Sequence, residues 1–474
     1  MKSLFKVTCE GARFDTLGDA EMGREETKKG VLFLGIISVL VSSWSAETAR
    51  AGELDDLKQQ VAELQKKVAQ AADLEQLKEQ ITELQNRITQ LEERQFQKEL
   101  VEKTGEEGAK EAETATLPDS LKWAENVKVS GDLRYRQDQK DEEDSTRPGG
   151  WEDGVYRHRI RARLMFEAIV NNEWDVAFRI ASGNDRSPIS TNQDLEDAFS
   201  KKYVWLDLGY FNWHPAKVQG LNVTGGKIKN PFYKAGKNQL IWDSDLNPEG
   251  IAVKYGKPLN DTDQFFFNGG GFWVDENSNV SDISLWGAQA YLKRTIGNPD
   301  HVLAGATYYD YANIESKADL RSTWGGSNFF GNTTSGGLYK DDFNIVEIFG
   351  EYGFRCISMP TILFASWVRN IVATTSEDTG WLVGVKFNQA KDDEPGSWEF
   401  GYDYRETDAD AVVGGFNESD FLGAQTNSRG HRFILKYQLA KNLYWNMTYY
   451  HLEDTRTTDE MDYRRFLGDL VWKF

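Results

Sequence analysis

The strongest constraint on the fold of this chain is a two-residue periodicity that runs from about Val127 to Phe474. In residues 381–388, 431–439 and 443–450, apolar or aromatic side chains alternate with more polar ones. Alternation of this kind predicts β-strands that bury one face and leave the other in contact with water. A soluble β-sandwich would show the same pattern, so the spacing between strands has to separate the two classes.

We predict sixteen strands in this region, joined by connections that alternate in length. The predicted strands are residues 126–137, 155–169, 173–182, 202–213, 221–228, 249–255, 263–274, 283–295, 301–312, 343–354, 360–370, 379–389, 396–405, 430–440, 442–453 and 463–474. The connections that follow odd-numbered strands run from 8 to 30 residues, whereas those that follow even-numbered strands run from 1 to 7. An even strand count with short turns at one end and long loops at the other is typical of an all-β, antiparallel outer-membrane barrel. Both chain termini of the barrel domain would then lie on the periplasmic side.

The composition excludes several other classes of protein. A helical membrane transporter would need several apolar runs of about 20 residues, and one run alone, near the N-terminus, comes close. Two cysteines in 474 residues exclude a disulfide scaffold, and a net charge of −20 argues against binding nucleic acid through its phosphates. The 15 Trp, 19 Tyr and 26 Phe residues suit a barrel that places aromatic side chains at both membrane interfaces.

The N-terminal residues 1–51 are predicted to be a leader with a secretory signal peptide. Lys28 and Lys29 precede an apolar stretch, which is followed by an A-x-A cleavage site at residues 49–51. An uncleaved membrane anchor is the alternative. Met22 would make a more ordinary start than Met1, and cleavage would leave Cys356 as an unpaired cysteine in an exported protein.

Residues 52–100 are predicted to form a periplasmic coiled coil. Their apolar residues are spaced alternately three and four apart, with one phase slip: Leu54, Leu57, Val61, Leu64, Val68, Ala71, Leu74, Leu77, Ile81, Leu84, Ile88 and Leu91. This heptad pattern favours a coiled coil over the alternative, an amphipathic helix packed on its own domain. Valine and isoleucine at one core position with leucine at the other lean toward a parallel dimer. Residues 101–119 then form an acidic linker to the barrel domain, residues 120–474.

The last strand carries a candidate assembly signal. Leu470, Trp472 and Phe474 share one face of an alternating strand that ends the chain. This arrangement resembles the C-terminal signature of Gram-negative outer-membrane proteins, which the barrel-assembly machinery reads.

Seven arginines are predicted to line the lumen. Arg157, Arg159, Arg161 and Arg163 share one face of a single strand, and the same phase on the flanking strands includes Arg134, Arg136 and Arg179. An arginine facing lipid costs about 2–4 kcal/mol at the membrane midplane, so these side chains should face inward. They are either paired with lumen acids for packing or form a basic wall along a water channel. We favour the wall, because sixteen strands enclose a lumen that side chains hardly fill.

The connection within residues 229–250 is predicted to fold into the lumen and narrow the pore. Its candidate constriction residues are Lys229, Tyr233, Trp242, Asp243, Asp245 and Glu249. Acids opposite an arginine wall would create a transverse field that sorts ions. Residues 243–254 superficially resemble a calcium loop, but Pro248 occupies the sixth position, where glycine is needed, and Lys254 occupies the twelfth. We therefore expect no metal ion and no cofactor.

Several segments resemble the putative porin family of Gram-negative outer membranes. They are residues 159–168 (RIRARLMFEA), 179–213 (RIASGNDRSPISTNQDLEDAFSKKYVWLDLGYFNW), 225–233 (GGKIKNPFY) and 241–255 (IWDSDLNPEGIAVKY). The likeness covers most of residues 120–474 and is strongest between 155 and 255. Members of that family often carry a signal peptide, a short coiled coil and then the barrel. The resemblance implies passive diffusion of small hydrophilic solutes through homo-oligomers, with trimers as the expected assembly.

The expected function is therefore an outer-membrane porin with a weak anion preference from its arginines, in contact with membrane lipid and lipopolysaccharide. One alternative is a tether that uses the coiled coil to hold the outer membrane at a set spacing. Another is a barrel enzyme. The chain lacks G-x-S-x-G, a P-loop and H-E-x-x-H, and its five histidines are scattered. A Ser/His pair across strands stays open at this point.

Overall fold

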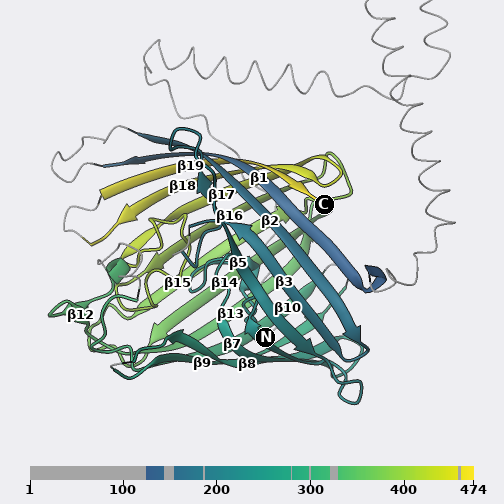
Figure 1. Ribbon diagram of the computed structural model, residues 1–474, viewed down its shortest axis with the longest axis horizontal. Coiled ribbons are helices and arrows are strands. Elements are labelled where there is room, and N and C mark those ends of the chain that lie inside the picture. Colours follow the sequence, from purple (N-terminus) through teal and green to yellow (C-terminus); the bar gives the residue numbers. More distant parts are fainter. Residues whose placement is uncertain are drawn as a thin grey trace, which may run out of the picture. The chain divides into compact units, whose positions relative to one another are not determined.

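The computed structural model describes residues 124–143, 154–184, 187–278, 280–297, 300–320, 329–456 and 461–474. The predicted leader (1–51), coiled coil (52–100) and acidic linker (101–119) lie outside these ranges. The described residues form an antiparallel β-sheet that closes on itself as a barrel (Figure 1). None of the helices among them is long and apolar enough to cross a membrane.

Sixteen long strands build the barrel in the described part of the chain, and each corresponds to one predicted strand. They are β1 (Val127–Glu142), β2 (Val155–Asn171), β3 (Trp174–Ser182), β5 (Val204–Trp213), β6 (Leu221–Lys227), β7 (Glu249–Pro258), β8 (Asp263–Asp275), β9 (Ile283–Thr295), β10 (His301–Ala312), β13 (Phe343–Cys356), β14 (Met359–Asn370), β15 (Thr379–Asn388), β16 (Trp398–Thr407), β17 (Ser428–Ala440), β18 (Leu443–Asp454) and β19 (Met461–Lys473). The prediction of a sixteen-stranded antiparallel barrel is confirmed. Strands β1 and β7 continue further than predicted, to Glu142 and Pro258.

Short elements occur within the connections. The two-residue strands are β4 (Gln193–Asp194), β11 (Thr334–Ser335) and β12 (Leu338–Tyr339), and the 3-10 turns are η2 (Ala235–Lys237) and η4 (Phe329–Gly331). Strand β4 pairs with β2, so that the loop after β3 folds back onto the barrel wall.

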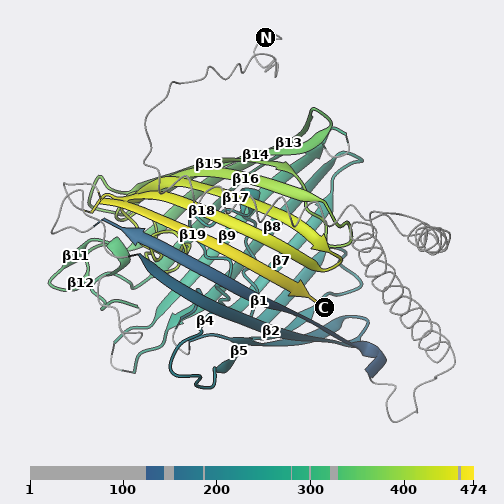
Figure 2. The ribbon, with the colours of Figure 1, turned by 90° about the horizontal axis from the view of Figure 1, so that it is seen from above.

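The barrel closes where the first strand meets the last. Strand β1 pairs with β19 in an antiparallel register from Asp132↔Lys473 to Glu142↔Tyr463, and Figure 2 shows the two strands side by side. Beyond β19, the Gly131 N–H donates to the Phe474 carbonyl at 2.8 Å, and the Phe474 N–H donates to the Gly131 carbonyl at 3.1 Å. Closure satisfies the backbone groups that an open sheet edge would leave exposed.

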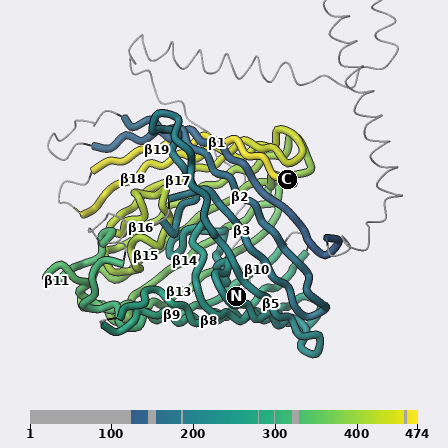
Figure 3. The backbone as a smooth tube through the Cα atoms, in the orientation of Figure 1, coloured from purple at the N-terminus to yellow at the C-terminus, as the bar shows by residue number. Residues whose placement is uncertain are grey.

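The two ends of the barrel differ in their connections. At one end, here called the turn end, the strands are joined by connections of two to nine residues. At the other, the loop end, lie the longer connections, among them residues 228–248 and 408–427. Figure 3 shows the C-terminus at the turn end and the loop with β11 at the opposite end. The predicted alternation of short turns and long loops is therefore present for most connections, whereas residues 276–282, 371–378 and 455–460 at the loop end are no longer than the longest turn.

The two faces of the barrel wall carry different side chains, because successive residues of a strand point to opposite faces. The outward face carries exposed aromatic side chains, including Trp174, Trp273, Trp286, Trp367, Trp381 and Trp472. The inward face of β1 carries Asp132, Arg134, Arg136 and Asp138, of which the last three are buried. An apolar outer face and a charged inner face match the solvent on each side of a membrane barrel.

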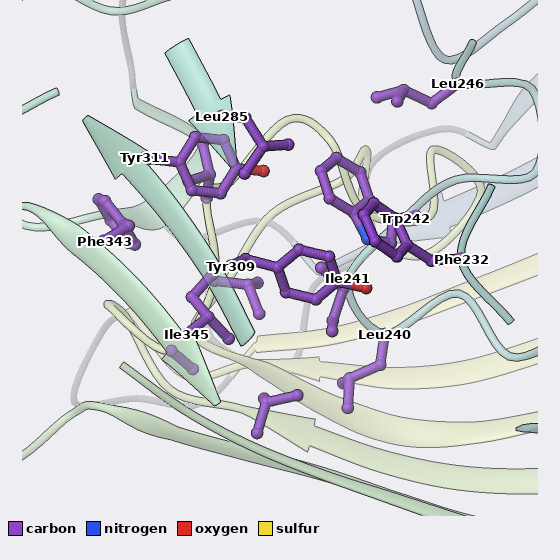
Figure 4. Packing of buried hydrophobic residues seen from close by; sticks show 14 of the residues in the cluster. Phe232, Leu240, Ile241, Trp242, Leu246, Leu285, Tyr309, Tyr311, Phe343 and Ile345 are labelled. Atoms are coloured by element: carbon purple, nitrogen blue, oxygen red, sulfur yellow. The ribbon is translucent and has the colours of Figure 1, made fainter. Parts of the chain in front are cut away.

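The apolar core of this domain lies inside the barrel. The inward faces of β9, β10 and β13 carry Leu285, Tyr309, Tyr311, Phe343 and Ile345, all at most 3% exposed. Against them pack residues of the connection between β6 and β7, namely Phe232, Leu240, Ile241, Trp242 and Leu246, as Figure 4 shows. One side of the lumen is thus filled by a folded loop, and the charged side is left to form a passage.

Candidate pore constriction

The loop that joins β6 to β7, residues 228–248, is here called the first inner loop. It is held by hydrogen bonds to the barrel wall: the Tyr233 N–H donates to Gln289 Oε1 at 2.7 Å, and Gln289 Nε2 donates to the Tyr233 carbonyl at 2.9 Å. The Gly236 N–H donates to the carboxylate of Glu351. Gly236 has a φ of +59°, and a Cβ there would lie 2.3 Å from the ring of Phe364. The site therefore requires glycine.

Gln289 belongs to a row of polar side chains that crosses five neighbouring strands beneath this loop. The row consists of Asn268, Gln289, Thr307, Glu347 and Ser366, joined by hydrogen bonds of 2.7 to 3.0 Å. All five side chains are at most 4% exposed. Mutual hydrogen bonding offsets the cost of burying these groups in an otherwise apolar wall.

A second loop, residues 408–427 between β16 and β17, also folds into the lumen, and the sequence analysis did not predict it. We call it the second inner loop. Asp243 joins the two loops: its Oδ1 accepts from the Asp245 N–H and its Oδ2 from the Ser419 N–H, both at 2.7 Å. The Asp243 N–H in turn donates to the Phe416 carbonyl at 2.7 Å. Burial raises the pKa of Asp243 to about 8, and the neighbouring Asp245 acts in the same direction.

The seven predicted lumen arginines all lie on the inner face of β1, β2 and β3, and each forms an ion pair. Their partners are seven aspartates: Asp132, Asp138, Asp194, Asp207, Asp245, Asp420 and Asp469. The shortest contacts are Arg159 Nε to Asp194 Oδ1 and Arg179 Nε to Asp207 Oδ2, both at 2.5 Å. The sequence allowed two interpretations, a basic wall along the lumen or arginines paired with lumen acids. The geometry contains both features, since arginines lie along the lumen and acids compensate their charge.

The two inner loops and the arginines enclose a cavity of about 280 Å³, the constriction cavity. Arg134, Arg136 and Arg161 line it from the barrel wall, whereas Asp243 and Asp245 line it from the first inner loop. In total five cationic and five acidic side chains face this cavity. The loop acids touch the wall: Arg163 NH1 lies 3.3 Å from Asp245 Oδ1, and Arg136 NH1 lies 2.9 Å from Asp420 Oδ2.

Two further cavities continue from the constriction cavity toward the turn end. The middle cavity, of about 310 Å³, shares Arg161, Tyr444 and Val471 with the constriction cavity. The vestibule, of about 670 Å³, shares Glu167 and Lys229 with the middle cavity. The three cavities therefore form one series along the charged side of the lumen.

Comparison with protein families identifies the barrel. The sequence model of the putative porin family matches residues 150–337 and 361–474, more than half of the chain. The chain belongs to the putative porin family. It is accordingly a porin-like outer-membrane channel, and its barrel architecture agrees with that assignment. A channel family is not an enzyme family, so the enzyme alternative is excluded.

Solved structures and curated proteins add the following. The chain is similar to the high-pH structure of OprB from Pseudomonas putida, with 13% identity and a TM-score of 0.49 over 75% of this chain and 96% of that one. It is also similar to a triple mutant of the Rhodopseudomonas blastica porin, with 12% identity and a TM-score of 0.42 over 73% of this chain and 100% of that one. Among curated proteins, none matches the chain.

The remaining predicted constriction residues of this porin occupy different surroundings. Lys229 lines the middle cavity and the vestibule. Tyr233 and Trp242 pack in the apolar core under the first inner loop instead of facing the passage. Glu249 begins β7, pairs with Lys227 at 2.8 Å, and does not line the constriction cavity. Of the predicted constriction residues, Asp243 and Asp245 therefore line the constriction cavity.

The second inner loop supplies constriction residues that sequence reasoning missed. Glu418 pairs with Arg432 at 2.6 Å and with Arg405 at 2.9 Å, and Asp420 pairs with Arg465 at 3.1 Å. Burial alone would raise the pKa of Asp420, but Arg136 and Arg465 outweigh it and hold that pKa well below its usual range. The alternation of strands β16, β17 and β19 places these three arginines on the lumen face. This alternation could have indicated that acids lie opposite these arginines in the lumen.

Metal binding is not suggested by the arrangement of ligands. Among the residues that the structure describes, no group of three or more His, Cys, Asp or Glu side chains is placed to hold a metal ion. Asp243 and Asp245, the acids of the calcium-like segment, are engaged by backbone N–H groups and by Arg163.

Proposed function

We propose that this porin is a diffusion channel for ions and small hydrophilic solutes. The observation that carries the proposal is the series of three cavities along the charged side of the lumen, which the apolar packing of the first inner loop leaves open. Guanidinium, carboxylate, hydroxyl and amide groups line this series and can exchange hydrogen bonds with a passing solute. An uncharged apolar solute would gain none of these interactions.

The proposed channel prefers anions weakly. In the constriction cavity five cationic side chains face five acids, one of which, Asp243, has a pKa raised to about 8, and in the vestibule three lysines face three carboxylates. The middle cavity carries the largest excess of cationic side chains, with five against two. A local excess within a balanced lumen attracts anions without excluding small cations.

The proposed setting is the outer membrane, with the turn end in the periplasm. The exposed aromatic belt would contact lipid, and the long loops would meet lipopolysaccharide. We also propose a homo-oligomer, with trimers as the expected state, and a periplasmic coiled coil at residues 52–100. Trp472 and Phe474 are 37% and 66% exposed on the outer face, where the barrel-assembly machinery could read them together with Leu470.

Planar-bilayer recording of the purified porin tests the channel. We expect stepwise conductance increases and, in a KCl gradient, a reversal potential displaced toward the chloride equilibrium potential. The absence of open steps would contradict diffusion through the barrel, and a reversal potential on the potassium side would contradict the anion preference. A variant that lacks residues 52–119 should keep its conductance, which separates the channel from any tethering role of the coiled coil.

A further inference from the structure

The middle cavity is lined by a set of groups that differs from those of its two neighbours. Its cationic side chains are Arg161, Arg163, Arg179, Lys229 and Lys473. Against them stand the carboxylates of Asp132 and Glu167 and the terminal carboxylate of Phe474, one oxygen of which accepts from the Gly131 N–H at 2.8 Å. The cavity therefore keeps a cationic excess after its terminal carboxylate is included.

Further acids pair with these cations, but they do not line the cavity. Arg179 donates through Nε to Asp207 at 2.5 Å, Arg163 donates to Asp245 at 3.3 Å, and Lys473 donates to Asp392 at 2.6 Å. None of these three aspartates faces the middle cavity. These aspartates orient the cationic groups from outside the cavity, as carboxylates orient metal-binding histidines. A small anion in the cavity therefore contacts the cations and not these aspartates.

The arginines retain donors for such an anion. A guanidinium has five N–H donors, of which Arg161 uses its Nε and NH2 nitrogens on Asp132. Arg179 uses only Nε in its hydrogen bonds to the described residues. Planar carboxylates match the geometry of two parallel guanidinium N–H groups, which favours this anion over a spherical one.

Lys229 is the cation of the cavity whose charge is least compensated. Its side chain forms no ion pair or hydrogen bond with the part of the chain that the structure describes, and it lines both the middle cavity and the vestibule. It lies on the first inner loop, whose fold is fixed by Gln289 and Glu351. Glu167, the acid that lines the same two cavities, is the group that would oppose an anion here.

The remaining lining is apolar and aromatic. Met165, Val471 and Tyr444 face the cavity, and the ring of Tyr444 lies 5.2 Å from Lys473 Nζ. Apolar surface of this kind would bury the body of an organic anion. A cavity of about 310 Å³ holds a molecule of a few to about ten non-hydrogen atoms.

We propose that the middle cavity is a binding subsite for small organic carboxylates. The proposal rests on the proposed channel function and names a solute class for it. The carboxylate binds between Lys229 and the guanidinium groups, and the apolar body lies against Met165, Val471 and Tyr444. The cavities on either side have a smaller cationic excess or none, so the anion binds during passage and leaves in either direction.

The test is block of single-channel KCl current by sodium benzoate, with acetate and benzyl alcohol as matched probes. We expect benzoate to reduce the current in a concentration-dependent manner, acetate to do so more weakly, and neutral benzyl alcohol to have no effect. Lys229→Gln should weaken benzoate block about three- to tenfold, as expected for the loss of one charge-assisted contact in a partly solvated site. Glu167→Gln should strengthen the block.

Lys254→Gln is the matched control, because Lys254 lines the vestibule but not the middle cavity. It removes the same lumen charge and should leave the benzoate affinity within twofold of wild type. Equal effects of the two lysine variants, or equal block by acetate and benzoate, would overturn the subsite as described. Benzoate-insensitive open channels would overturn only the subsite, whereas a wild-type protein without conductance steps would overturn the channel function itself.

Discussion

Replacing Asp243 by alanine should separate the two inner loops while leaving the barrel intact. The substitution removes the acceptor of two backbone N–H groups, those of Asp245 and Ser419, each at 2.7 Å. A buried donor left without a partner costs about 1–3 kcal/mol, so two of them cost about 2–6 kcal/mol. Because Asp243 lines the constriction cavity, water reaches the freed groups, and we expect the low end, about 2–3 kcal/mol. That loss shifts the equilibrium of loop contact about 30- to 150-fold.

The assay combines current recording with limited proteolysis. In Asp243→Ala we expect larger and noisier open-channel currents, and faster chymotrypsin cleavage at Phe416 or Phe421. Phe421 is 1% exposed while the two inner loops are in contact. Ser244→Ala is the control, because Ser244 is the exposed neighbour in the same loop. If the Asp243 variant matches wild type in both current noise and cleavage rate, the carboxylate does not hold the loops together and the reasoning is refuted.

Three further predictions concern the charges and the loop anchor. Arg465→Ala should destabilise the barrel by about 3–5 kcal/mol in urea unfolding, because it removes one ion-pair partner of Asp138, which is 0% exposed. In the control Arg294→Ala, which removes an exposed ion pair, the free energy of unfolding should stay within about 1 kcal/mol of wild type. Gly236→Ala should increase current fluctuations, since its Cβ would lie 2.3 Å from an aromatic ring, and an unchanged current trace would contradict the anchoring of the loop. The pKa of Asp243 is raised to about 8, so the folded arrangement favours the protonated side chain. The stabilisation of the loop contact by protonated Asp243 is therefore fully present below pH 4 and is lost as the pH rises through about 8. Open-channel noise should therefore increase between pH 7 and 9 in wild type but not in Asp243→Asn.

The sequence was sufficient to predict the strands and the side of the wall that each arginine faces. Alternation assigns Arg157 and its neighbours to one face, and the cost of placing them in lipid decides which face it is. Some partners of these arginines could not be predicted, because they come from distant segments. Arg136, for example, pairs with Asp469, 333 residues further along the chain. Pairing across the closing strands depends on the register, which a single strand does not reveal.

The second inner loop shows the other limit. Residues 408–427 contain acids and glycines, as outer loops commonly do, so composition did not distinguish an inward fold. The apolar stretch Ala411–Val412–Val413, which is at most 2% exposed, was the one unusual feature. The stretch belongs to the same apolar cluster as residues of the first inner loop and of strands β9, β10 and β13. An inward fold of one loop thus depends on another loop, and such dependence cannot be read from local pattern.

The junction of β1 with β19 has a consequence for the order in which the barrel forms. Every other pair of neighbouring long strands is consecutive in the chain and can form as a local hairpin, whereas this junction joins Asp132 to Lys473. Bringing together ends about 340 residues apart costs about 5 kcal/mol of chain entropy by the logarithmic loop-closure relation. Strands that are already paired remove most of that cost, so closure is favoured as the last step. Folding of this porin should therefore end with the zipping of one seam, and mechanical or thermal opening should begin there.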